Sequence, residues 1–164
     1  MHFLRSVRAT LVASPALLVL AIATQAFAGI EGGVKAVQAN DMPLAEKELT
    51  PLAKERDPRA QFLLGLYVYG NPNSKLFDLT KAAPLLLDCS ERGYPPAMIP
   101  LAGAYADGKG VPKSMYDSYK WLLIADRWNA PNVAPLLEQV GKELKPEEIE
   151  KAKAEALAFT FKTK

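Results

Sequence analysis

The sequence predicts an all-α fold, an α/α superhelical solenoid built from antiparallel helix pairs. Apolar residues recur at helical spacing, for example at Ala60, Leu64 and Tyr67. The stretch AQFLLGLYVYGN from Ala60 also aligns with AMIPLAGAYADG from Ala97, at an offset of 37 residues. Internal repetition with a period of roughly 20 to 50 residues is typical of solenoids, because each unit buries its apolar face against the next.

The repetition continues beyond this stretch at an offset of 36 residues. Two sets of residues carry it: Leu49, Leu85 and Trp121, and Ala53, Cys89 and Ala125. The change from 37 to 36 predicts that the first loop, 71–77, is one residue longer than its counterpart. We expect both sets, Cys89 and Trp121 included, at buried helix-packing positions.

Eight helices follow from this pattern, and the short connections between them make successive helices antiparallel neighbours. They are predicted over residues 31–40, 43–56, 58–70, 79–92, 95–107, 114–128, 131–143 and 146–161. Several begin near a proline, where the missing N–H costs little. Four prolines fall inside, at positions 51, 84, 100 and 135, and predict kinks or late helix starts. The helices form an opening hairpin (31–56), repeat one (58–92), repeat two (95–128) and closing helices (131–161).

Residues 1–28 are predicted to be a secretory signal peptide. Arg5 and Arg8 precede an apolar run over 11–23, and the small-x-small site AFA ends at Ala28. The run is shorter than the roughly 20 residues that span a bilayer. Cleavage after Ala28 would leave residues 29–164 as a repeat domain that is periplasmic or secreted and not embedded in a membrane.

The charges and reactive residues of 29–164 exclude several functions. Only Arg5 and Arg8 are lost with the leader, so 18 basic and 18 acidic residues remain, without the basic surface that nucleic-acid binding needs. The single histidine, His2, is lost too, which excludes Ser-His-Asp and Cys-His sites. Cys89 alone makes neither a disulfide nor a zinc site. We expect no catalytic residues, no metal and no cofactor.

The repeating units resemble Sel-1-like repeats, relatives of the tetratricopeptide repeat. The resemblance rests on AQFLLG followed by KAAPLLLDCSERG, and most of all on LAGAYADGKGVPKSMYDSYKWLLIA, which contains the Gly-x-Gly-Val turn. In the first unit Val68 stands where the family commonly has Tyr, and NPNSKLF replaces the turn. The resemblance implies a scaffold for protein contacts.

The turn Gly108-Lys109-Gly110 invites comparison with a phosphate-binding loop. Such a loop lies between a strand and a helix, and its lysine is followed by Ser or Thr. Here the turn follows a predicted helix and Lys109 is followed by Gly110. We therefore interpret both glycines as left-handed residues at a helix end, and we expect Asn71 in the same role in the first unit.

A second apolar stripe on helix 58–70 is the candidate binding surface. Phe62, Leu66 and Tyr69 are spaced i, i+4, i+7, and their equivalents 37 residues later are Ile99, Gly103 and Ala106. Large residues facing small ones predict a groove for a helix or extended segment of a partner. The candidate binding residues are Phe62, Leu66, Tyr69, Ile99 and Gly103. The alternative is that a terminal helix of the array covers the stripe.

The expected function is that of a non-enzymatic exported adaptor or scaffold, which binds another protein of the bacterial cell envelope. Two alternatives stay open. One is an enzyme or small-molecule binder acting on cell-wall material, because a hydrolase that uses only carboxylates needs no histidine. The other is a constitutive subunit of an envelope complex.

Overall fold

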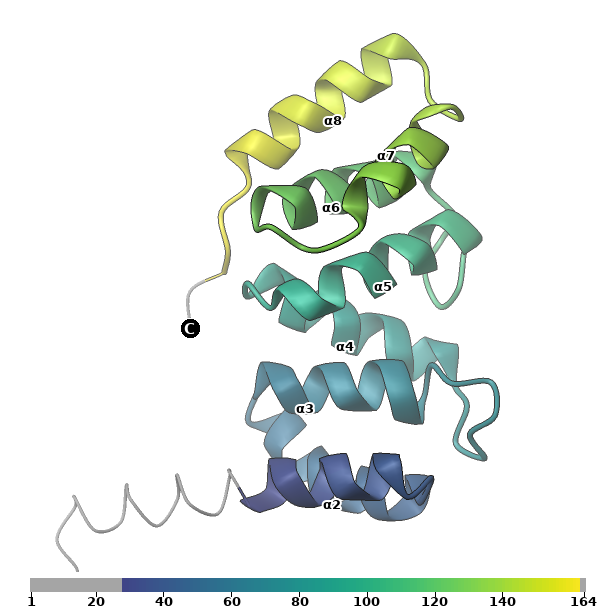
Figure 1. Cartoon of the computed structure of the whole chain (residues 1–164), viewed down its shortest axis with the longest axis vertical. Coiled ribbons are helices and arrows are strands. Elements are labelled where there is room, and N and C mark those ends of the chain that lie inside the picture. Colours follow the sequence, from purple (N-terminus) through teal and green to yellow (C-terminus); the bar gives the residue numbers. More distant parts are fainter. Residues whose placement is uncertain (1–27, 163–164) are drawn as a thin grey trace, which may run out of the picture.

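The structure, a computed structural model, describes residues 28–162, in which every regular element is helical (Figure 1). The predicted signal peptide lies outside the described residues except for Ala28. A helix over residues 28–38 is followed by α2 (Met42–Lys54), α3 (Pro58–Leu63), the π-helical turn η1 (Leu64–Val68), α4 (Leu79–Glu91), α5 (Pro95–Asp107), α6 (Met115–Arg127), α7 (Val133–Gly141) and α8 (Pro146–Ala158). The all-α prediction is confirmed. Within the described range no helix has the length and apolar character of a membrane span.

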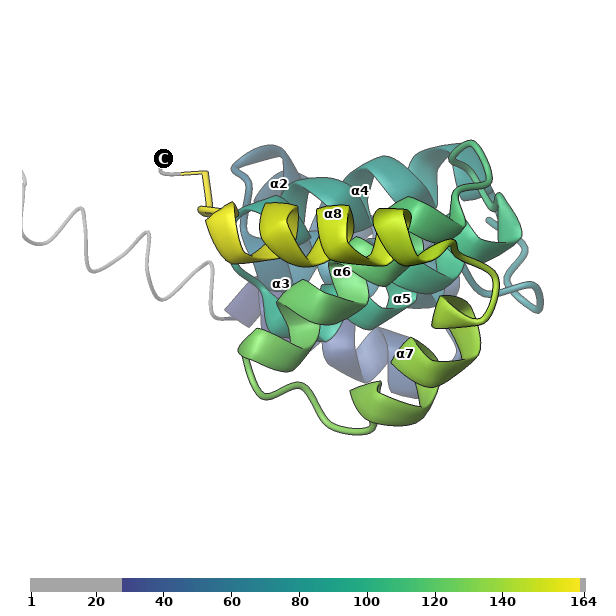
Figure 2. The ribbon, with the colours of Figure 1, turned by 90° about the horizontal axis from the view of Figure 1, so that it is seen from above.

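The helices stack along the long axis of the molecule, and from α2 to α7 each contacts its neighbours in sequence (Figure 1). Near the C-terminal end α6 contacts both α7 and α8: α8 is stacked over it, and α7 lies to one side (Figure 2). This is the geometry of a short solenoid, in which short connections place successive helices side by side.

Local signals in the sequence account for the helix starts. Asp57 accepts a hydrogen bond from the backbone N–H of Arg59 at 2.9 Å, directly before Pro58 at the first position of α3. Ser114 caps α6 by accepting from the backbone N–H of Asp117 at 3.0 Å. Such caps satisfy N–H groups that have no partner within the helix.

The four interior prolines affect their helices in two different ways. Helices α2, α4 and α5 continue through Pro51, Pro84 and Pro100 without a late start. Helix α7 begins at Val133, two residues later than predicted, so Pro135 falls in its first turn, where its missing N–H has no helical partner to lose.

Left-handed residues end several helices. Gly108 ends α5 with φ 71° and Gly110 follows with φ 75°, as predicted. The prediction for Asn71 is wrong, because Asn71 is not among the residues with positive φ and its side chain instead accepts from the N–H of Asn73 at 2.9 Å. A second repeating set was not anticipated, at the ends of α2, α4 and α6: Arg56, Gly93 and Asn129.

Two clusters of buried residues form the core, and α4 contributes to both. Ala82 belongs to the cluster with α2 and α3, and Leu86 and Cys89 to the cluster with α5 and α6. Cys89 is fully buried and Trp121 is 5% exposed, as predicted from the 36-residue spacing, whereas Leu85 of the same set is only partly buried.

The extra residue of repeat one lies inside a helix and not in the loop. The backbone O of Tyr69 accepts from the N–H of Asp78 at 2.9 Å, and that of Tyr105 accepts from the N–H of Ser114 at 2.8 Å. Tyr69 and Tyr105 are therefore equivalent at an offset of 36 residues, and the loops that follow have equal length. The prediction of a longer loop over 71–77 is wrong.

The π-turn η1 absorbs this residue, since a π-helix closes its hydrogen bond one residue later than an α-helix. Val68 is buried like Ala104, whereas Tyr67 is 40% exposed, which marks Tyr67 as the inserted residue. Repeat one therefore does have the tyrosine that Val68 seemed to replace. It is Tyr69, shifted by one position.

The C-terminal segment departs from the predicted helix 146–161. Helix α8 ends at Ala158, and residues 159–162 run back past α6 in an extended course (Figure 1). Phe159 packs edge-on against Trp121, with ring centres 5.4 Å apart. The N–H of Lys162 donates to the backbone O of Glu91 at 2.8 Å, which fastens this C-terminal strap to the end of α4.

Candidate functional site

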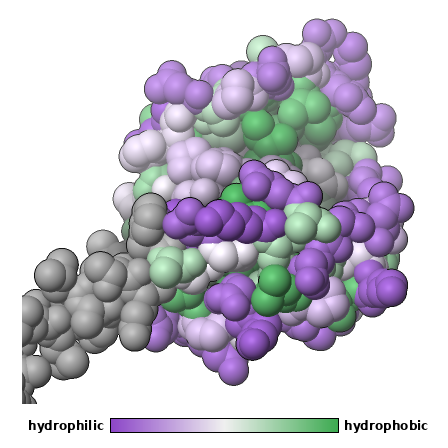
Figure 3. Space-filling model, turned by 60° about the horizontal axis from the view of Figure 1, so that its bottom comes forward, coloured by the Kyte–Doolittle hydropathy of each residue, from purple (hydrophilic) through white to green (hydrophobic). Residues whose placement is uncertain are grey.

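Apolar side chains gather in separate patches between hydrophilic ones on the face shown in Figure 3. The candidate site itself follows α5. One hollow of about 230 Å³ lies between η1, α4 and α5, and Leu66, Pro100 and Gly103 line it. A second hollow of about 230 Å³ lies between α5, α6 and α7. Both hollows include Gly103 and Asp107, so they meet across α5 and form one surface, the α5 groove.

Gly103 makes this continuity possible. A Cβ placed on Gly103 would meet no atom within 4 Å apart from its own helix, so the space above it is open. A larger residue there would raise a ridge between the two hollows. No other described element lies within 4 Å of that point, so the groove is open at Gly103.

The α5 groove extends toward the start of α5. A further hollow of about 450 Å³ shares Ile99 and Pro100 with it, and Trp128 and Pro131 form its far wall. Trp128 is 48% exposed, although its ring packs edge-on against Phe161 at 4.8 Å between centres. Prolines and an exposed indole present apolar surface that loses little conformational freedom when a partner covers it.

The structure brings three of the five predicted binding residues together. Leu66, Ile99 and Gly103 all line the connected hollows along α5. Phe62 is partly buried and packs against the rings of Tyr67 and Tyr94, with centres 6.0 and 5.5 Å apart. Phe62 lines none of these hollows and acts as support for α3.

Tyr69 does not belong to the groove, and the predicted stripe is wrong at this position. It is 7% exposed, and its hydroxyl donates to Glu46 at 2.6 Å. In a regular α-helix residues i, i+4 and i+7 share a face. The inserted residue in η1 turns Tyr69 by about 100° away from Phe62 and Leu66, given 3.6 residues per turn.

Part of the lining comes from residues outside the predicted stripe. Leu136 and Val140 of α7 form a wall of the second hollow, and Trp128 forms a wall of the third. The sequence did contain a signal for the α7 wall. Leu136 and Val140 are spaced i, i+4, which places them on the same face of a short helix. Pro100 was considered only as a helix breaker.

One ion pair marks the end of the groove. Lys109 Nζ lies 2.7 Å from the Asp107 carboxylate, and this hydrogen bond holds the pKa of Asp107 below its ordinary value. Gly110 is required in the turn that carries Lys109, because a Cβ there would lie 2.0 Å from the backbone O of Leu79. The turn thus closes against α4, in agreement with its structural interpretation.

The carboxyl groups near the groove are not arranged as an acid-base pair. Burial raises the pKa of Asp117, but hydrogen bonds from Lys120 and Ser114 outweigh it and leave the pKa lowered. Asp107 has a lowered pKa as well. Neither carboxyl has the raised pKa that a general acid needs at neutral pH. Over the described part of the chain, no three His, Cys, Asp or Glu side chains gather as metal ligands would.

The comparison with solved structures identifies the fold. The structure is similar to the crystal structure of a protective antigen present in uropathogenic Escherichia coli strains, a protein that displays an SLR fold. The TM-score is 0.74, with 20% sequence identity over 82% of this chain and 29% of that one. The chain thus spans less than a third of the length of that protein. No family model matches the sequence, and no curated protein matches it either.

The stacked helix pairs define a class of fold, the helical-repeat solenoids. Within that class the chain has the SLR fold, as the resemblance to Sel-1-like repeats implied.

Proposed function

We propose that this chain is a non-enzymatic scaffold of the bacterial cell envelope that binds a segment of another envelope protein in the α5 groove. The observation that carries the proposal is the open position at Gly103, where two hollows join along one helix. The groove is mostly apolar, with the Asp107–Lys109 pair at its end and Ser118, Gln139 and Asn129 as further polar side chains in its lining. It therefore suits an apolar helix or extended segment with a polar end.

The substitution Gly103→Arg tests this role without disturbing the fold. Gly103 is helical and open, so the larger residue fits and gains up to about 1 kcal/mol of helix propensity. We expect the melting temperature to stay equal or rise. A partner recovered from envelope extract with the wild-type protein should be lost with Gly103→Arg.

The matched control is Ala154→Arg, which adds the same side chain to an exposed position on α8. This variant should recover the partner as the wild type does. Equal recovery by both variants would show that the α5 groove is not the binding surface.

Export is the second part of the proposal, supported by the order of basic residues, apolar run and AFA site in residues 1–28. The protein released by osmotic shock should have the mass of a chain that begins at Gly29. A soluble cytoplasmic product that retains residues 1–28 would contradict export.

A further inference from the structure

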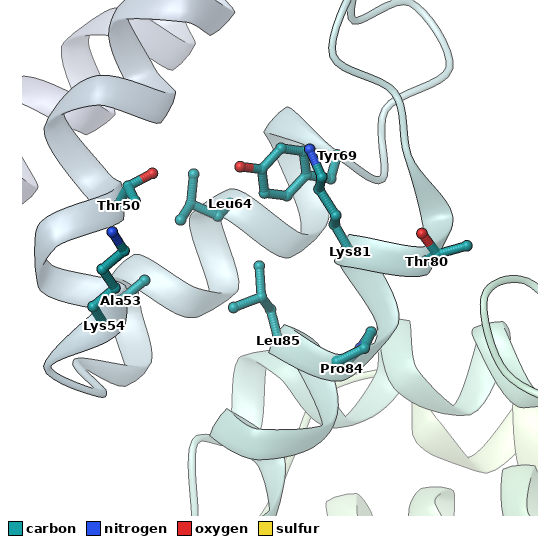
Figure 4. Close-up of a pocket in the computed structure, with 9 residues that line it drawn as sticks. All are labelled: Thr50, Ala53, Lys54, Leu64, Tyr69, Thr80, Lys81, Pro84 and Leu85. Atoms are coloured by element: carbon teal, nitrogen blue, oxygen red, sulfur yellow. The ribbon is translucent and has the colours of Figure 1, made fainter.

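A separate hollow of about 360 Å³ lies between α2, η1 and α4 (Figure 4). Its apolar surface comes from Ala53, Leu64 and Leu85, and Lys54 and Lys81 stand on either side of it. This α2–α4 hollow is at the small end of the roughly 300 to 1,000 Å³ typical of ligand pockets.

One wall of the hollow is held in place. The ring of Tyr69 lines it, and the Tyr69 hydroxyl is fixed by its 2.6 Å hydrogen bond to Glu46. Burial, reinforced by that bond, raises the pKa of Tyr69 to about 12, so the hydroxyl remains a donor. Lys81 Nζ lies 5.1 Å from the centre of the ring, which positions an ammonium group beside the apolar surface (Figure 4).

The equivalent position 36 residues later, between α4 and α6, is filled. At the offset of 36 residues Trp121 corresponds to Leu85, and Leu86 corresponds to Thr50, which also lines the hollow. Trp121 and Leu86 are each only 5% exposed. The hollow therefore exists between α2 and α4 because the side chains there are smaller than those at the equivalent positions between α4 and α6.

The charges differ between the repeats in the same way. Ser90 of α4 and Asp117 of α6 stand 36 residues after Lys54 of α2 and Lys81 of α4. Asp117 is paired with Lys120 at 2.8 Å. Lys54, in contrast, has no ion pair within the described residues, and the acid nearest to Lys81 is Asp78 at 3.9 Å. Asp78 already accepts hydrogen bonds from Thr80 as the cap of α4.

We propose that the α2–α4 hollow binds a small amphiphilic anion, an aliphatic chain with a carboxylate head. The chain lies on Ala53, Leu64 and Leu85, and the carboxylate meets Lys54 and Lys81 at the rim. Apolar burial supplies the attraction and the lysines select the sign of the head group. This inference goes beyond the proposed scaffold function and does not depend on it.

Calorimetric titration of the full chain with octanoate tests the proposal, with octyltrimethylammonium as a probe of equal chain length and opposite charge. Octanoate should bind saturably at one site, and the cation should not. Equal binding of both probes, or no saturable binding of octanoate, would overturn the proposal. The absence of saturable octanoate binding would overturn the proposal even if a partner protein covers this surface instead.

Two substitutions locate the site. Leu85→Trp copies the residue of repeat two and should abolish octanoate binding. Lys54→Met removes one ammonium and should weaken binding about fivefold, as expected for a partly exposed ion pair of about 1 kcal/mol. Lys151→Met, at an exposed lysine of α8, is the matched control and should bind as the wild type does. Unchanged binding by Lys54→Met would overturn the site even if Leu85→Trp failed to fold.

Discussion

Cys89 illustrates at the residue scale how burial decides chemistry. Its thiol is fully buried and donates to the backbone O of Leu86 at 3.4 Å. Burial, followed by the nearby charge of Asp88, raises the pKa of the thiol to about 12. Because the thiolate is the reactive form, we predict that a thiol reagent labels Cys89 only after denaturant is added. Rapid labelling of the native protein would instead indicate an accessible redox thiol.

The same shift sets a direction for pH dependence. The folded pKa of Cys89 lies above the ordinary value of 9.0, so the unfolded chain releases the proton first as the pH rises. The contribution of the thiol to stability is complete below pH 9.0 and is lost as the pH rises toward about 12. Cys89→Ala should therefore lose less stability than the wild type between these values in chemical denaturation.

The two tryptophans provide a contrast between core and surface. Trp121 is 5% exposed and packs against Phe159, whereas Trp128 is 48% exposed. Trp121→Ala should lower the free energy of unfolding by roughly 3 to 5 kcal/mol, because it removes a large buried side chain. Trp128→Ala, the control, should lower it much less. Denaturant titration measures both, and equal effects would contradict the repeat alignment that equates Trp121 with Leu85.

At the element scale, the π-turn η1 yields a prediction about deletion. Removing Tyr67 should convert η1 into regular α-helix and align Val68 and Tyr69 with Ala104 and Tyr105. The variant should fold, at a cost of about 0.5 to 1.5 kcal/mol for the lost contact between the Tyr67 and Phe62 rings.

Deletion of Ala104 is the control for this prediction, because α5 has no inserted residue to absorb it. The rest of α5 would turn by about 100°, which displaces Tyr105 from its contacts. Thermal melts followed by circular dichroism compare the two deletions. Equal destabilisation would show that Tyr67 is not the inserted residue.

Element boundaries and the binding surface could be predicted only in part, and η1 explains why. Apolar spacing located the helices closely, since proline and glycine mark their ends. Spacing alone could not tell an insertion in the helix from one in the loop over 71–77, because both leave the same offset of 36 afterwards. The assignment of Tyr69 to the groove failed for that reason. Leu66 precedes the inserted residue, and Ile99 and Gly103 lie on α5, which has no insertion, so their predicted positions were not affected.

At the scale of the whole molecule, the solenoid was predictable because its interactions are between sequence neighbours. Helix pairs that repeat at 36 or 37 residues contact the next pair, so one unit predicts the surroundings of the other. Contacts that break this rule gave no signal. Residues 159–162 contact the end of α4 and so bypass the whole second repeat in sequence. The apolar periodicity within α8 carries no information about this contact.

The C-terminal strap leads to a prediction for the whole array, whose two repeats are fewer than the three that such arrays usually need. Phe159 and Phe161 cover Trp121, Trp128 and Gly93, and Lys162 binds both the backbone and the side chain of Glu91.

Truncation after Ala158 would expose this aromatic cluster. We expect it to lower the free energy of unfolding by about 2 to 4 kcal/mol, consistent with the loss of two partly buried phenylalanines, and to shift tryptophan fluorescence to longer wavelength. Truncation after Lys162 retains every one of these contacts and serves as the control, so it should melt as the wild type does. If truncation after Ala158 left both the melt and the fluorescence unchanged, the strap would contribute nothing to the closure of the solenoid.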